Sequence, residues 1–161
     1  LLGPLTNPAG ARRQLLGVFD GERVGMMAEA LCRLGAERAM VVHGHDGMDE
    51  ITTVAPTTIA HVRSGTVEME EFDAASLGVA RATHADLAVD TLDGAAQVIE
   101  GVLRGESGAA RDIVVVNAAA ALLVGDVARS WEEGAAIARA AIDEGRALQV
   151  LDGLRRAGRN E

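Results

Sequence analysis

A strand, an amphipathic helix and a second strand follow one another within the first 42 residues, and this order constrains the fold most strongly. Residues 13–19 form a short apolar run bounded by polar residues, which predicts a strand. Asp20 then occupies the position of a helix N-cap, and residues 21–34 carry apolar side chains three or four positions apart. These apolar positions are Val24, Met27, Leu31 and Leu34. Residues 39–42 are continuously apolar, as in a strand buried on both faces, so the unit predicts two parallel strands joined by a right-handed crossover.

The rest of the chain continues with a hairpin and then with helices. Residues 57–62 and 67–70 alternate between apolar and polar, and residues 63–66 between them have the composition of a turn, while Pro56 interrupts a longer strand. A helix is predicted from Thr91 to residue 102 or 103, and Ser130 caps a further helix whose Ala-rich part covers 135–154. Residues 113–123 fit a strand at their start and a helix at their end, so pattern alone leaves them open.

The chain of 161 residues has the length of one domain, and 48% apolar with 24% charged residues predicts a folded α/β protein. No apolar run approaches the roughly 18 to 20 uncharged residues of a membrane helix, and the start lacks the pattern of a secretory signal. We therefore expect a cytoplasmic protein without a membrane partner. Because the chain opens Leu1-Leu2-Gly3-Pro4 without Met, we expect residues 1–161 to be a single incomplete domain from a longer polypeptide.

The charged residues and small motifs exclude several classes of function. The net charge is −9, so nucleic acid is an unfavourable partner. All 15 basic residues are Arg, which excludes Schiff-base chemistry and a phosphate-binding lysine of the Walker type. No two glycines are two positions apart, so no dinucleotide fingerprint exists, and no G-x-S-x-G elbow is present. Cys32 is alone, which excludes a disulfide within the chain and a cysteine-based zinc site.

The densest group of metal-ligating side chains directly follows the strand at 39–42. It comprises His43, His45, Asp46, Asp49 and Glu50. In a parallel α/β sheet this position is the carboxyl edge, where ligands usually bind. Mg²⁺ is often held by one or two carboxylates while substrate phosphates and water complete its coordination. The adjacent acids at 49 and 50 are therefore enough protein ligands for a magnesium site.

Plainer interpretations of the same group stay open. Acidic side chains in a loop can be ordinary solvated charge, and the two histidines can serve local hydrogen bonds. The segment at 43–46 is also distantly similar to the H-x-H-x-D loop of dinuclear hydrolases, but its aspartate stands one position early and no further His follows. For His61 and His84, no neighbouring residue indicates a function.

Residues 1–9 form the second candidate segment. Two prolines and a glycine within six positions predict a stiff loop that could wall an apolar pocket, and the alternative is an ordinary rigid connection.

These segments together resemble one family. The sequence L-G-P-L-T-N-P, followed by V-V-H-G-H-D-G-M-D-E, by V-N-A-A-A-A-L at 116–122 and by S-W-E-E-G at 130–134, is similar to anthranilate phosphoribosyltransferase over essentially the whole chain. The resemblance implies the phosphoribosyltransferase and nucleoside-phosphorylase-like α/β domain, with a mixed sheet flanked by helices. It also implies that residues 113–123 are helical.

The resemblance further implies a reaction and a site. The phosphoribosyl group of phosphoribosyl diphosphate would pass to anthranilate, with Mg²⁺ as cofactor, in tryptophan biosynthesis, and the complete protein would be a homodimer. Asp49 and Glu50 match the Mg²⁺-binding pair of the family, and Gly3 and Pro4 match a loop lining the anthranilate site.

Three family motifs have no counterpart in these 161 residues. They are the G-T-G-G-D diphosphate loop, the K-H-G-N segment and an arginine upstream of L-G-P-L, and all of them would precede Leu1. We therefore expect the isolated chain to be inactive. Two alternatives stay open: a related enzyme such as a pyrimidine nucleoside phosphorylase, and a non-catalytic relict or module that completes a partner.

Overall fold

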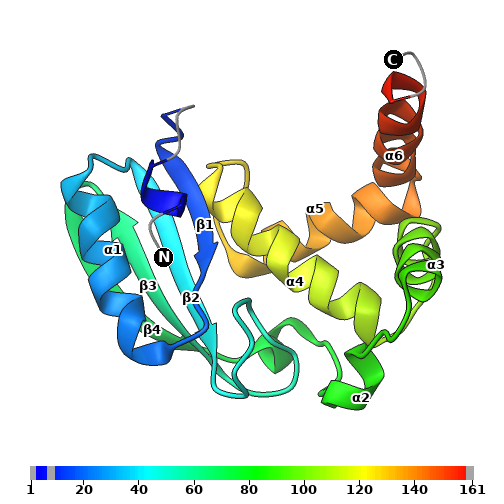
Figure 1. Cartoon of the computed structure of the whole chain (residues 1–161), viewed down its shortest axis with the longest axis horizontal. Coiled ribbons are helices and arrows are strands. Elements are labelled where there is room, and N and C mark those ends of the chain that lie inside the picture. Colours follow the sequence, from blue (N-terminus) through cyan, green and yellow to red (C-terminus); the bar gives the residue numbers. More distant parts are fainter. Residues whose placement is uncertain (1–2, 7–9, 159–161) are drawn as a thin grey trace.

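A mixed four-stranded sheet in the order β1-β2-β3-β4 forms the centre of the computed structural model, which describes residues 3–6 and 10–158 (Figure 1). The strands are β1 (Arg13–Gly17), β2 (Arg38–Gly44), β3 (Thr57–Arg63) and β4 (Thr66–Phe72). β1 and β2 are parallel, whereas β2, β3 and β4 pair antiparallel. The predicted α/β class, with a mixed sheet flanked by helices, is confirmed.

Helices cover both faces of this sheet. One face carries α1 (Val24–Arg33), and the other carries α4 (Ala109–Val124) and α5 (Trp131–Asp143), as Figure 1 shows. Farther from the sheet lie α2 (His84–Leu87), α3 (Leu92–Leu103) and α6 (Arg146–Ala157). The short 3₁₀ helices are η1 (Gly3–Thr6), η2 (Gly21–Arg23) and η3 (Ala74–Leu77). Within the described residues no helix is long and apolar enough to cross a membrane.

β2 separates two hydrophobic cores because its side chains alternate between the faces of the sheet. Ala39 and Val41 pack in the core beneath α1, and Met40 and Val42 pack in the core beneath α4. All four are at most 5% exposed. The continuous apolar run was therefore correctly interpreted as a strand buried on both faces.

The first strand and helix are shorter than their patterns predict. β1 ends at Gly17 rather than at Phe19, whose side chain is 65% exposed, because the chain turns there toward the cap formed by Asp20. The predicted helix over 21–34 begins as the 3₁₀ turn η2 and ends at Arg33. Leu34, predicted on the buried face, is 65% exposed because it follows the last helical residue.

The predicted hairpin is confirmed, with a tighter turn than expected. Ser64 and Gly65 have φ angles of 52° and 80°, and two left-handed residues are typical of a type I′ turn. The pairing therefore continues to Arg63 and resumes at Thr66, and β3 starts directly after Pro56.

The C-terminal prediction of one helix over 135–154 is wrong. The chain forms α5 and α6, separated at Gly145, which has a φ of 72°. A left-handed glycine after a helix is a common C-terminal stop. The other helical predictions hold: Thr91 caps α3, Ser130 caps α5, and residues 113–123 lie within α4.

Candidate functional site

The loop between β2 and β3, residues 45–56, starts at the carboxyl edge of β2, as predicted for the acidic group. Its backbone lies directly on the end of β1. A Cβ atom added to Gly17 would stand only 1.5 Å from the carbonyl oxygen of Asp49, so only a glycine allows this approach. The position of Asp49 is therefore determined by its contact with β1.

Asp46 anchors this loop. Its side chain is 6% exposed, and its Oδ2 accepts a hydrogen bond of 2.9 Å from the Thr52 hydroxyl. The ring Nε2 of His84 stands 3.5 Å from the same oxygen. Because Asp46 is committed to these contacts, it serves to shape the loop. His84, for which no neighbouring residue indicated a function, lies beside it.

Asn117 of α4 holds the residue that follows the two candidate ligands. Its Oδ1 accepts from the amide of Ile51 at 3.0 Å, and its Nδ2 donates to the carbonyl of Ile51 at 2.8 Å and to that of Ile113 at 3.0 Å. Ile51 is fully buried. The side chain thus fixes the backbone next to Glu50 to the helix beneath it. Sequence reasoning missed this role, and the available signal was a single amide within an apolar helical run.

Asp49 and Glu50 are the acids of the loop that lack a partner. Among the described residues, neither side chain makes an ion pair or a hydrogen bond. Asp49 is exposed, whereas Glu50 is half-buried and lines a largely apolar cavity of about 400 Å³ between the loop, α3 and α4. Burial raises the pKa of the Glu50 carboxyl above its ordinary value, and the negative charges of Asp49 and Asp46 raise it further.

This arrangement favours a bound cation. Two adjacent carboxylates without a positive partner repel each other, and a divalent ion would remove that repulsion. The described residues contain no cluster of three or more His, Cys, Asp or Glu side chains that could enclose a metal by themselves. Asp49 and Glu50 offer two adjacent carboxylates, and Mg²⁺ is often held by one or two carboxylates while water or substrate completes its coordination.

The two histidines of the loop are engaged in local contacts. The Nδ1 of His43 lies 2.8 Å from the carbonyl oxygen of Val18, and the Nε2 of His45 lies 2.9 Å from the Thr58 hydroxyl. These bonds match the interpretation in which both rings serve the surrounding structure.

The candidate residues Gly3 and Pro4 lie in η1. Gly3 is exposed, its carbonyl accepts from the Thr6 hydroxyl at 3.3 Å, and the side chain of Pro4 lies outside the described part. Leu5 packs toward the core beneath α1. The described contacts do not bring Gly3 to Asp49 or Glu50, so the role of this segment stays a prediction. The remainder of the expected stiff loop, residues 1–2 and 7–9, lies outside the described residues.

Comparison with known proteins places this chain in a family. Residues 1–148 match the model of the glycosyl transferase family, a/b domain. Anthranilate phosphoribosyltransferase from Acetivibrio thermocellus is 49% identical over 152 residues, which are 94% of this chain and 44% of that protein. The enzyme of the same name from Rubrobacter xylanophilus is 49% identical over 160 residues, 99% of this chain and 47% of its own length.

Solved structures agree with the sequence comparison. Anthranilate phosphoribosyltransferase from Thermus thermophilus superposes with a TM-score of 0.84 at 37% identity, over 94% of this chain and 44% of that one. The enzyme from Saccharomyces cerevisiae in complex with PRPP and Mg gives a TM-score of 0.83 at 26% identity, with the same coverage. The chain spans less than half the length of these relatives. It belongs to the glycosyl transferase family, of which it carries the α/β domain.

Proposed function

We propose that the polypeptide containing this chain is an anthranilate phosphoribosyltransferase, which moves the phosphoribosyl group of phosphoribosyl diphosphate to anthranilate in tryptophan biosynthesis. The observation that carries the proposal is the unpartnered pair Asp49 and Glu50 at the carboxyl edge of β2. Support comes from relatives that are 49% identical and bear this name, and from a structural neighbour that holds PRPP and Mg. Curated relatives of this name favour the transferase over a nucleoside phosphorylase.

Asp49 and Glu50 would hold Mg²⁺. The ion would offset the charge of the diphosphate leaving group, which is the main chemistry that such a transfer requires. The chain's own contribution is to fix the two carboxylates: the loop rests on Gly17, turns around Asp46 and is bound to α4 through Asn117. The half-burial of Glu50 against apolar side chains lowers the local dielectric and strengthens its attraction for a cation.

Other parts of the proposal concern the complete protein. Gly3 and Pro4 would line the anthranilate site, residues 1–161 would be one incomplete α/β domain, and the isolated chain would be inactive. We further propose that the complete protein is a cytoplasmic homodimer. These statements rest on the family resemblance, and the length of the relatives agrees with an incomplete domain.

Removal of both carboxylates tests the proposed function. In the full-length protein, Asp49→Asn combined with Glu50→Gln is expected to abolish Mg²⁺-dependent formation of phosphoribosyl anthranilate while the circular dichroism spectrum stays unchanged, because neither carboxylate makes an ion pair or a hydrogen bond within the described residues that the substitutions would break. Asp143→Asn with Glu144→Gln is the matched control, since it neutralises the chain's other adjacent Asp-Glu pair, whose side chains pair with Arg111 and Arg146. Turnover that stays unchanged at saturating Mg²⁺ in the first variant would remove the pair from the mechanism.

A further inference from the structure

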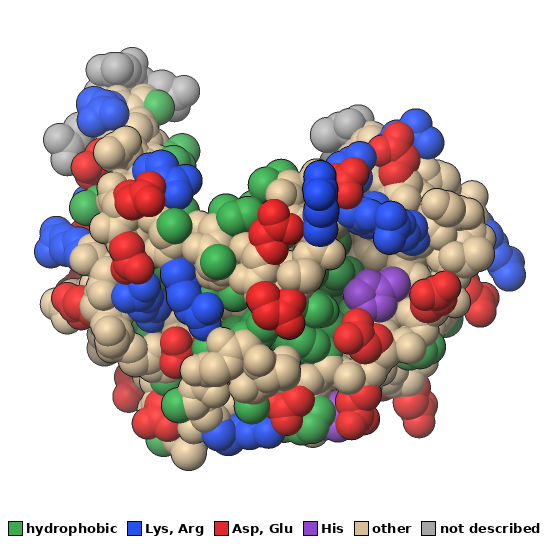
Figure 2. Space-filling view, turned by 180° about the vertical axis from the view of Figure 1, so that it is seen from behind, with side chains coloured by type: hydrophobic (Ala, Val, Ile, Leu, Met, Phe, Trp, Pro, Cys, Tyr) green, Lys and Arg blue, Asp and Glu red, His purple; other side chains and the backbone are tan. Residues whose placement is uncertain are grey.

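A second cavity lies at the end of β2 opposite the acidic pair. Its volume is about 310 Å³, and it is enclosed by β2, β3 and the loop that joins α4 to α5. Its apolar lining includes Met40, Leu123 and Trp131. Figure 2 shows the face on which the sheet and the helices leave a hollow with hydrophobic side chains at its floor and charged side chains around its rim.

This cavity is separate from the proposed magnesium site. Arg38, the first residue of β2, lines the cavity, whereas the acidic loop begins beyond Gly44, the last residue of the strand. Seven residues of extended chain place the two sites about 20 Å apart. A ligand of the cavity would therefore not touch Asp49 or Glu50.

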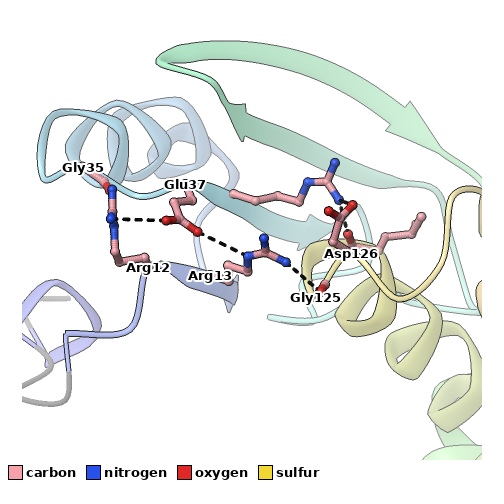
Figure 3. Close-up of polar contacts among 8 residues, drawn as sticks. Arg12, Arg13, Gly35, Glu37, Gly125 and Asp126 are labelled. Carbon is pink, nitrogen blue, oxygen red and sulfur yellow. Dashed lines mark hydrogen bonds and ion pairs between the residues drawn. The ribbon is translucent and has the colours of Figure 1, made fainter.

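Arg38 fixes the wall of the cavity that the loop between α4 and α5 forms. The Nη1 of Arg38 donates to the carbonyl of Leu123 at 2.8 Å and to the carboxylate of Asp126 at 2.6 Å. Asp126 has a φ of 63°, a left-handed conformation that is uncommon for a residue other than glycine, and it lies in the turn that ends α4, where the amides of Val127 and Ala128 donate to the carbonyl of Leu122 at 2.9 and 3.2 Å. In Figure 3, Arg13 joins this wall by donating to the carbonyl of Gly125 at 2.7 Å.

Two other arginines that line the cavity make no ion pair and no side-chain hydrogen bond within the described residues. Most arginines among residues 10–158 pair with a carboxylate or donate to a carbonyl, and three have neither an ion pair nor a side-chain hydrogen bond: Arg63, Arg129 and Arg156. Arg63 and Arg129 both line this one cavity. The remaining titratable ring of the lining, His61, is engaged with Glu70 at 2.6 Å. Both arginines are exposed, and in a chain of net charge −9 two guanidinium groups without a partner among the described residues at one cavity are an exception.

We propose that this cavity binds a small organic carboxylate with an apolar body. Arg63 and Arg129 would receive the carboxylate, because a guanidinium group offers paired donors that match its two oxygens. The apolar part would rest on Met40, Leu123 and Trp131. The volume falls within the usual range for small-molecule sites, which is about 300 to 1,000 Å³.

Trp131 provides a local reporter for the test. It is the single tryptophan of the 161 residues, it lines the cavity, and its ring stacks on Phe72 at 4.1 Å between centroids. The full-length protein is labelled with 5-fluorotryptophan, and its ¹⁹F resonance is assigned by its loss in Trp131→Phe. Titration with benzoate is expected to shift this resonance saturably, and benzamide, which has the same ring without the charge, is expected to bind at least tenfold more weakly.

Substitution of the arginines tests whether they bind the carboxylate. Arg63→Gln combined with Arg129→Gln is expected to raise the dissociation constant of benzoate at least tenfold, whereas Arg156→Gln, which removes the third unpaired arginine on α6, leaves it unchanged. Equal affinity in the double variant, or no saturable shift at millimolar benzoate, would overturn the proposal. Binding of benzoate at an acceptor site elsewhere would not depend on Arg63 and Arg129, so this result is independent of the proposed transferase function.

Discussion

Charged side chains near the two ends of β2 follow the same pattern with opposite signs, because some of them have a partner in the fold and others do not. At the amino end, Arg38 is anchored by Asp126, while Arg63 and Arg129 have no acidic partner among residues 3–6 and 10–158. At the carboxyl end, Asp46 is anchored by Thr52, while the acids that follow it in the loop, Asp49 and Glu50, have no basic partner in the described part of the chain.

The comparison separates two roles of charged residues. A charged side chain that is mostly buried must be hydrogen-bonded or paired, and it then acts as part of the framework. A charge that the fold leaves without a partner costs stability or contributes nothing, so its place beside a cavity points to a ligand. Arg38 and Asp46 have the first role, and Arg63, Arg129, Asp49 and Glu50 have the second.

The largest expected effect is on the support of the acidic loop. Gly17→Ala should lower the free energy of unfolding by about 3 kcal/mol or more, because its new Cβ would collide with the backbone of Asp49. Gly25→Ala in α1, where no atom lies within 4 Å of the added Cβ, is the matched control and should change stability by less than about 1 kcal/mol. Urea unfolding measures both. Equal stability of the two variants would show that the loop is not seated on β1.

Loss of the amide that joins the loop to α4 should rank second. Asn117→Ala should cost about 2 kcal/mol, because the buried amide and carbonyl of Ile51 would lose their partner. It should also raise the Mg²⁺ concentration required for half-maximal activity in the full-length protein. Gln149→Ala removes an exposed amide on α6 and should change neither quantity. An unchanged Mg²⁺ requirement in Asn117→Ala would mean that this side chain does not position Glu50.

At the opposite end, the anchored arginine should affect stability alone. Arg38→Met should lower the free energy of unfolding by about 1 to 2 kcal/mol, since the carbonyl of Leu123 and the carboxylate of Asp126 lose a donor. The Mg²⁺ dependence of turnover should not change. A shift in that dependence, measured in the same assay, would contradict the separation of the two ends.

The smallest expected effect is a gain in stability from Glu50→Gln. Because the pKa of Glu50 is raised in the folded state, the folded protein retains its proton longer than the unfolded chain does, and stability falls as pH rises through the interval between the two values. Glu50→Gln removes this penalty. It should therefore stabilise the metal-free protein at pH 7 and give no such gain at a pH below the ordinary value of a glutamate. Urea midpoints at the two pH values measure the difference, and a variant that is less stable than the wild type at pH 7 would refute it.

The sequence predicted the part of the site that local rules control. The apolar strand at 39–42 and the polar loop after it predict that Asp49 and Glu50 lie at the carboxyl edge of the sheet, and β2 ends at Gly44 accordingly. The positions of the strands followed from the spacing of apolar residues, and the N-cap of α3 at Thr91 followed from the capping signal.

The remaining features depend on contacts between distant parts of the chain. Asn117 meets Ile51 across 66 positions, and Arg38 meets Asp126 across 88. The spacing of residues along the sequence predicts neither contact. Whether an arginine such as Arg63 has an acidic partner depends on which acidic side chains the fold brings close to it. The break at Gly145 was missed because the apolar spacing continues through it, while its φ angle appears only in the structure.

The central claim is that Asp49 and Glu50 together hold the metal. Crystals of the full-length protein grown with phosphoribosyl diphosphate and Mn²⁺, measured at the manganese absorption edge, test it most directly. We expect an anomalous peak at about 2.1 Å from carboxylate oxygens of these residues, the distance of direct coordination. An ion bound to the diphosphate elsewhere, with both carboxylates facing bulk solvent, would contradict the account.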